Sequence, residues 1–106
     1  MAMFVVIRAR GPAWDESKPM RAQWDWDEHA RFMEQLVADG VVLLGGPTSD
    51  DNKVLLIVDA IDEEAVRERL AHDSWHKAGL LLIERVARWE VLLDFRQPGL
   101  TLKADH

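Results

Sequence analysis

The most constraining feature of the sequence is the stretch from residue 25 to residue 47, where an amphipathic helix runs directly into a short apolar strand. Side chains recur in it at the spacing of one helical face, and this stripe consists of His29, Phe32, Met33, Leu36 and Val37. Asp25 and Glu28 are spaced as a capping pair for the helix start, and Gly40 suits the left-handed position after the last turn. His29 is the one member of the stripe that titrates near neutral pH, so we expect acid–base activity here to depend on it.

The rest of the chain adds strands and a second helix in a recognisable order. Runs of apolar and β-branched residues predict strands at 3–9, 41–44 and 54–60 and a longer extended segment at 80–93. A second helix is expected over 62–72, and residues 10–24, with one glycine and two prolines, are typical of a long loop. The order strand, helix, strand, strand, helix, strand predicts an α+β fold of the ferredoxin-like βαββαβ type, with two helices on one face of an antiparallel sheet.

The predicted strands are apolar on both sides, which a sheet with one face in water would not be. Two helices cover only one face of such a sheet. We therefore expect the sheet of a second copy to cover the other face, in a two-fold homodimer or a higher oligomer. The alternative is a monomer in which Trp14, Trp24 and the C-terminal tail lie across the open face.

Length, charge and cysteine content exclude several classes of protein. With 106 residues, the chain is expected to form one domain over 1–94, followed by a C-terminal arm or tail over 95–106. A net charge of −6 disfavours a nucleic-acid partner, and the lack of cysteine excludes disulfides, a thiolate nucleophile and cysteine-ligated metals. No apolar run is long enough to span a membrane, and residues 1–7 do not form a signal sequence, so we expect a cytoplasmic protein with no membrane partner.

Three short motifs occur in a fixed order: EHARF in the first helix, DGVVLLGGP after it and HDSWHKAGLL after the second helix. Together they resemble the YCII-related family of small bacterial proteins, over residues 3–93. This resemblance implies a dimeric α+β barrel built from two ferredoxin-like subunits. It also implies that His29 and Asp73 form the active-site pair. Trp26 stands where the family often has a basic residue, and Ser74 where it commonly has proline, so no substrate is carried over.

The chemistry of a histidine and an aspartate explains why this pair would be catalytic. Imidazole has an ordinary pKa of about 6.5, so it accepts or donates a proton near neutral pH. A carboxylate bonded to one ring nitrogen fixes the tautomer and leaves the other nitrogen for a substrate. The same arrangement predicts a cleft between helix and sheet, whose candidate substrate-binding residues are Gly46, Pro47, Trp75 and Trp26. The alternative is that His29 is a satisfied core residue and that Asp73 only caps a turn.

His72 and His76 have the spacing of metal ligands on one helical face, with Asp73 between them. Asp73 and Gly79 argue against a helix that continues so far. We therefore expect neither a metal ion nor a cofactor.

These residues support two hypotheses about function. In the first, the chain is a cofactor-independent enzyme that uses His29 and Asp73 for proton transfer in elimination, isomerisation or lactone chemistry on a small organic molecule. By resemblance, some relatives are linked to dehydrochlorination of aromatic breakdown products. In the alternative, the chain is a non-catalytic dimeric module that binds a small ligand in the same cleft without converting it.

Overall fold

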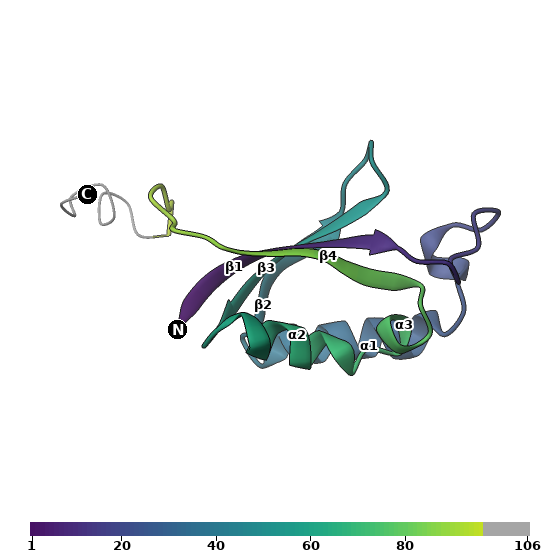
Figure 1. Ribbon diagram of the computed structural model, residues 1–106, viewed down its shortest axis with the longest axis horizontal. Helices are drawn as coiled ribbons and strands as arrows, with labels where there is room; N and C mark the ends of the chain where they lie inside the picture. Colours follow the sequence, from purple (N-terminus) through teal and green to yellow (C-terminus); the bar gives the residue numbers. More distant parts are fainter. Residues whose placement is uncertain (97–106) are drawn as a thin grey trace.

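The chain has the ferredoxin-like order of elements that its sequence predicts. The computed structural model describes residues 1–96. Its elements are β1 (Ala2–Arg10), the 3-10 helix η1 (Met20–Ala22), α1 (Trp26–Ala38), β2 (Val42–Pro47), β3 (Lys53–Ala60), α2 (Glu63–Ala71), α3 (Ser74–Lys77) and β4 (Leu81–Arg88). The helices α1, α2 and α3 lie on one face of the sheet, and no helix of the described chain covers the other face (Figure 1). The predicted fold class is therefore confirmed.

The sheet has four antiparallel strands in the order β2-β3-β1-β4. Its register changes between β1 and β4, where Ile7 pairs with Arg85 but Arg8 pairs with Ile83. Glu84 is therefore an extra residue in β4, and such a bulge bends the strand and redirects nearby side chains. The sequence predicts an extended segment over 80–93 with a kink near Glu84 and Arg85, and β4 itself ends at Arg88.

The core lies between the sheet and the helices. Alternate residues of β1 and β3 meet the apolar faces of α1 and α2 there, in a cluster that contains Phe4, Val6, Leu36, Leu56, Val58, Val66 and Leu70. Full burial of each such side chain contributes about 1.5–3 kcal/mol. The intervening strand residues, among them Val5, Ile7 and Ile57, point to the other face and are only partly buried. Both faces of the sheet thus carry apolar side chains, as predicted.

The two long helices begin differently. Asp62 caps α2 through its side chain, which accepts a hydrogen bond of 2.9 Å from the backbone N–H of Ala65. Asp25 precedes α1 but makes no side-chain cap, so the predicted capping pair with Glu28 is wrong. The physical reason is that Asp25 has a φ of 57°, whereas a capping side chain needs an extended backbone to reach the first turn.

The long loop between β1 and α1 folds back on itself at one end of the molecule (Figure 1). The buried Gln23 side chain holds it together, because its amide accepts a hydrogen bond from Asp15 N and donates to Asp15 O and Lys18 O. Trp14 is buried, and its ring meets that of Trp75 edge-on at 5.6 Å between centroids. Trp14 therefore packs on the helical side and does not cover the open sheet face, and Trp24 is 62% exposed.

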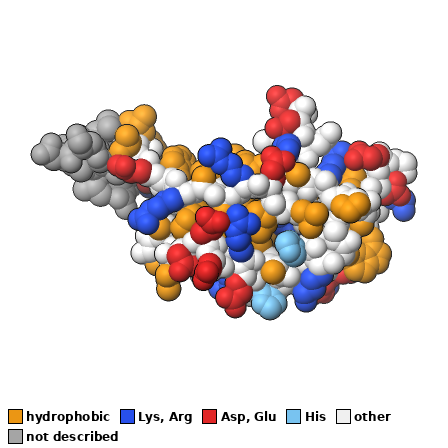
Figure 2. All heavy atoms as spheres, in the orientation of Figure 1, with side chains coloured by type: hydrophobic (Ala, Val, Ile, Leu, Met, Phe, Trp, Pro, Cys, Tyr) orange, Lys and Arg blue, Asp and Glu red, His pale blue; other side chains and the backbone are white. Residues whose placement is uncertain are grey.

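The surface is mixed in character. On the face that Figure 2 presents, acidic and basic side chains are interspersed with hydrophobic ones. Among residues 1–96, no helix has the length and apolar content needed to cross a membrane. Only residues 95 and 96 of the predicted tail belong to the described part of the chain, and the remainder of that prediction lies outside it.

Candidate active site

The fold brings His29 and Asp73 together although 44 positions separate them in the sequence. His29 lies in the first turns of α1, and Asp73 is the residue before α3. The His29 Nδ1 atom is 2.9 Å from each oxygen of the Asp73 carboxylate. An ionised carboxylate only accepts hydrogen bonds, so Nδ1 carries the hydrogen and Nε2 is the ring nitrogen left for a ligand.

A third residue, Arg8, completes this cluster. One of its terminal nitrogens is 2.9 Å from Asp73 Oδ2, and the other donates a hydrogen bond of 3.2 Å to the backbone oxygen of Leu81. Both side chains of this ion pair are almost fully buried, with exposed fractions of 1% for Arg8 and 0% for Asp73. Asp73 Oδ1 also accepts a hydrogen bond of 3.1 Å from the N–H of Trp75, so each carboxylate oxygen is held from more than one side.

Arg8 was not among the predicted site residues, although the sequence contains a signal for it. Phe4, Val6 and Arg8 alternate along β1, so they share the buried face of that strand. An arginine at a core position needs a buried partner, because an unpaired charge there is costly. In the structure that partner is Asp73.

The surroundings set the ionisation of the cluster. Burial alone would raise the pKa of Asp73, but the hydrogen bond from His29 and the charge of Arg8 outweigh it, so the pKa lies below its ordinary value. Burial lowers the pKa of Arg8 by more than Asp73 raises it. A guanidinium nevertheless stays charged at neutral pH. The buried charges of Arg8 and Asp73 therefore compensate each other beside His29.

Trp75 supports the histidine from behind. Its ring is parallel to the His29 ring, with 3.8 Å between centroids and 4° between planes. Trp75 is fully buried and is not among the residues that line the cleft. The structure thus places this predicted substrate-binding residue as a stacking partner of His29 rather than as part of the cleft wall. The Trp26 ring is 5.8 Å from that of His29, and Trp26 does line the cleft.

The cleft has a volume of about 460 Å³ and opens between α1 and the sheet. His29 and Arg8 line it together with three of the predicted substrate-binding residues, Trp26, Gly46 and Pro47. Asp73 lies behind His29 and is not part of the wall. Most of the remaining wall is apolar and includes Met33, Val37, Val42 and Leu56. A cleft of this size and character suits a small organic molecule.

The comparisons with known proteins agree with this geometry. The profile of the YCII-related domain matches residues 2–90. The chain belongs to the YCII-related family. The resemblance that the sequence motifs indicate is thereby confirmed. No curated protein matches the chain.

One solved structure similar to this YCII-related chain is 5-chloro-2-hydroxyhydroquinone dehydrochlorinase from Burkholderia phenoliruptrix AC1100, in complex with 2,5-dihydroxybenzoquinone. The two sequences are 27% identical, and the similarity covers 83% of this chain and 93% of the other. The TM-score is 0.63. The dehydrochlorinase therefore has the same fold over nearly its whole length.

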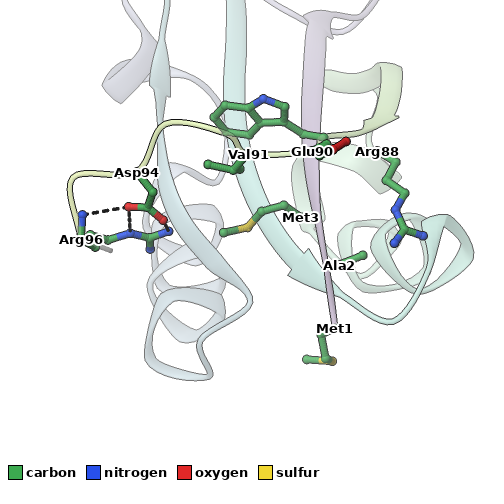
Figure 3. A pocket seen from close by; sticks show the side chains of 9 residues that line it. Met1, Ala2, Met3, Arg88, Glu90, Val91, Asp94 and Arg96 are labelled. Atoms are coloured by element: carbon green, nitrogen blue, oxygen red, sulfur yellow. Dashed lines mark hydrogen bonds and ion pairs between the residues drawn. The ribbon is translucent and has the colours of Figure 1, made fainter. Parts of the chain in front are cut away.

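A second hollow of about 480 Å³ lies elsewhere on this YCII-related chain, between the start of β1 and the residues after β4 (Figure 3). Its wall includes Asp94, whose carboxylate accepts hydrogen bonds from the backbone and side chain of Arg96. No histidine lines it within the described residues. The hollow beside His29 is therefore the better candidate for acid–base chemistry.

The histidines considered for a metal do not meet in one site. His72 is exposed at the end of α2, and His76 lies in the short helix α3. Within residues 1–96, no three His, Asp or Glu side chains form a group that would hold a metal ion.

Proposed function

We propose that this YCII-related protein is an acid–base enzyme that acts on a small organic molecule, with His29 as the proton-transferring residue. The observation that carries the proposal is the position of His29 between a buried carboxylate and an open cleft. Its Nδ1 is bonded to Asp73, whereas the residue itself is one of those that line the cleft. A histidine that served only the core would have no such access to a ligand.

The neighbouring residues have distinct roles in this proposal. Asp73 fixes the tautomer of His29 and stabilises the imidazolium that forms when Nε2 accepts a proton. Arg8 keeps Asp73 ionised within the buried cluster. Trp75 holds the imidazole ring in plane by stacking, and the apolar cleft wall binds the body of the substrate.

We infer that the reaction is an elimination, such as the loss of hydrogen chloride. His29 Nε2 takes a proton from a hydroxyl or carbon of the substrate, and the electrons of that bond move into the ring system. These electrons end in a new double bond to the carbon that bears chlorine, which is tetrahedral in the keto form of the ring, as a chloride ion leaves with the electrons of its own bond to that carbon. The imidazolium afterwards returns its proton to water. The support for this reaction class is the similarity in sequence and fold to a dehydrochlorinase.

Chloride release from 5-chloro-2-hydroxyhydroquinone tests the proposal, because the similar enzyme is named for this compound. The wild-type chain should release chloride, and His29→Gln should lower the rate by at least about 100-fold, the usual size of a general acid–base contribution. Asp73→Asn should also lower the rate. His72→Gln is the matched control, because His72 is exposed and lies outside the cleft.

The same assay addresses the alternative function. If neither the wild-type chain nor any variant releases chloride, but the wild type and His29→Gln bind 2,5-dihydroxybenzoquinone equally well, the elimination enzyme is contradicted. A ligand-binding module would then be the better description.

We also propose that the protein works as a homodimer in which the open faces of two sheets pack together. The support is the apolar character of that face, which carries Val5, Ile7 and Ile57 and no covering helix of the described chain. The expected dimeric α+β barrel is the assembly that the family resemblance implies.

A further inference from the structure

The cleft beside His29 differs in charge from the rest of the protein. The whole chain has a net charge of −6. The cleft wall nevertheless includes Arg8, Arg10 and Arg21, against a single carboxylate, that of Glu34. Positive charge in an otherwise acidic protein attracts an anion only where a carboxylate does not already balance it. An anion is therefore expected at whichever of the three arginines lacks a carboxylate partner.

Two of these arginines already have carboxylate partners. Arg8 is paired with Asp73, and Arg10 is 2.9 Å from a carboxylate oxygen of Glu16. Arg21 differs from both, because no carboxylate among residues 1–96 forms an ion pair with it. Among the described arginines of the cleft wall, Arg21 could therefore bind an anionic ligand without first losing an ion pair to a carboxylate.

Arg21 is exposed, and its backbone lies in an ordered part of the loop. It belongs to η1, and the side chain of Gln23 ties the preceding part of the loop together through its hydrogen bonds to Asp15 and Lys18. Its guanidinium carbon lies 5.7 Å from the ring centroid of Trp26, within the range of a cation–π contact. This contact directs the charge to the end of the cleft where α1 begins.

The position of Glu34 makes the two ends of the cleft different in charge. Glu34 follows Trp26 by eight residues in α1, which corresponds to about 12 Å along a helix axis. The unpaired cation and the single carboxylate of the wall therefore lie at different distances from the helix N-terminus, whose partial positive charge adds to that of Arg21. An anionic group is thus favoured at the Arg21 end and disfavoured near Glu34.

We propose that Arg21 is the anion-binding residue of the cleft and that the ligand is a small organic anion. Its oxyanion, a carboxylate or an ionised phenol or enol, binds the Arg21 guanidinium, and its body contacts the apolar wall beside His29. This inference rests on the proposed function in that it places the ligand in the same cleft. It adds the charge of the ligand and the residue that recognises it.

Binding of matched charged and neutral probes tests the proposal. Isothermal titration calorimetry compares benzoate with benzamide for the carboxylate, and para-nitrophenolate with para-nitroanisole for the phenolate. The wild type should bind at least one anion about tenfold more tightly than its neutral partner, and added salt should reduce the difference. Whichever anion is preferred identifies the source of the oxyanion.

Variants of single residues then assign the effect. Arg21→Gln should weaken binding of the preferred anion about tenfold and leave the neutral probe unchanged, whereas Arg21→Lys should retain part of the preference. Arg31→Gln is the matched control, because Arg31 is an exposed arginine of α1 that does not line the cleft and should have no effect. The proposal is overturned if no anion binds, if charged and neutral probes bind equally, or if Arg21→Gln retains the preference.

The results distinguish a failure of this proposal from a failure of the proposed catalytic function. If Arg21→Gln loses the preference for anions while His29→Gln and the wild type show no difference in turnover, the binding residue stands and the catalytic role of His29 fails. If chloride release depends on His29 but Arg21→Gln binds every probe as the wild type does, the enzyme stands and this inference fails.

Discussion

At the scale of single residues, the site depends on the buried carboxylate of Asp73, which three other residues bind. Asp73 accepts hydrogen bonds from His29 and Trp75 and is paired with Arg8. A buried ion pair of this kind contributes little net stability, because both ions lose their hydration. Removal of one partner alone is costly, since the other charge then stays buried without compensation. The cluster is therefore best understood as a device that fixes His29.

This account predicts the result of a double-mutant cycle on the ion pair. Arg8→Met and Asp73→Asn should each lower the free energy of unfolding by about 3 kcal/mol, because each leaves an uncompensated charge. The double variant should lose clearly less than the sum of the two single losses. Urea denaturation measures all four proteins. Strict additivity of the two losses would contradict the pairing.

The lowered pKa of Asp73 predicts how stability depends on pH. A carboxyl whose pKa is lower in the folded than in the unfolded chain contributes stability above the unfolded value, about 3.9, and loses it as the pH falls through the folded value. The wild type should therefore lose stability steeply below a pH of about 4.

Denaturation at a series of acidic pH values measures this loss. Asp73→Asn should flatten the profile, whereas Asp15→Asn, at an exposed carboxyl whose pKa is lowered mainly by its hydrogen bond from the Ser17 side chain, should change it far less. If both variants flatten the profile equally, the buried carboxyl of Asp73 contributes no more to the pH dependence of stability than an exposed one does.

The sequence predicted part of this site and not the rest. His29 stood out because it is a titratable residue on an apolar helical stripe, and Asp73 because a family motif contains it. Arg8 was not predicted, because a single arginine near the end of an apolar strand is usually exposed. Its alternation with Phe4 and Val6 nevertheless places it on the buried face. The burial of Trp75 depends on tertiary packing, which no local pattern reveals.

At the scale of elements, the periodic segments were predictable and the connections were not. The helices and strands follow from hydrophobic spacing and from Gly40, which has a φ of 75° at the end of α1. The short helix α3 and the left-handed backbone of Asp25 do not follow from any periodic pattern in the sequence. The long loop is also more ordered than its composition suggests, because the Gln23 side chain ties it together.

The junction of this loop with the sheet gives a prediction for an alanine substitution. A side chain at Gly11 would meet the backbone oxygen of Gly79 at 2.2 Å, in the turn before β4. Gly11→Ala should therefore lower the free energy of unfolding by about 2 kcal/mol, because backbone has to move to relieve the overlap. The contact between Trp14, in this loop, and Trp75 should weaken in the same variant.

Gly46→Ala is the control, since no atom lies within 4 Å of its added methyl group. Its stability should stay within about 0.5 kcal/mol of the wild type. Thermal and urea denaturation measure both variants. A Gly11→Ala protein as stable as Gly46→Ala would show that the junction is not tightly packed.

At the scale of the whole molecule, the two faces of the sheet are covered unequally. One face of the sheet is covered by three helices, and the other is open in the described chain (Figure 1). Ile57 is partly buried in the middle of the open face, beside Val5 on β1, and Leu44 on β2 is 71% exposed. An apolar surface of this kind usually marks an interaction site.

We therefore predict a dimer in solution. Multi-angle light scattering should give twice the monomer mass of 12.1 kDa. Ile57→Lys should give a monomer with an unchanged circular dichroism spectrum, because it places a charge in the interface without touching the core. Ile61→Lys, at a 74% exposed residue outside the sheet, should remain dimeric. A wild type that stays monomeric at micromolar concentration would refute the dimer.

The parallel rings of Trp75 and His29 have a spectroscopic consequence. An imidazolium in contact with an indole accepts an electron from its excited state and quenches its fluorescence. Because Trp75 is fully buried, dissolved quenchers do not reach it, and its emission responds to the rings around it, among which that of His29 lies nearer than those of Trp14 and Trp26. The protein thus carries an internal optical probe that reports when its central histidine gains or loses a proton, without any added dye.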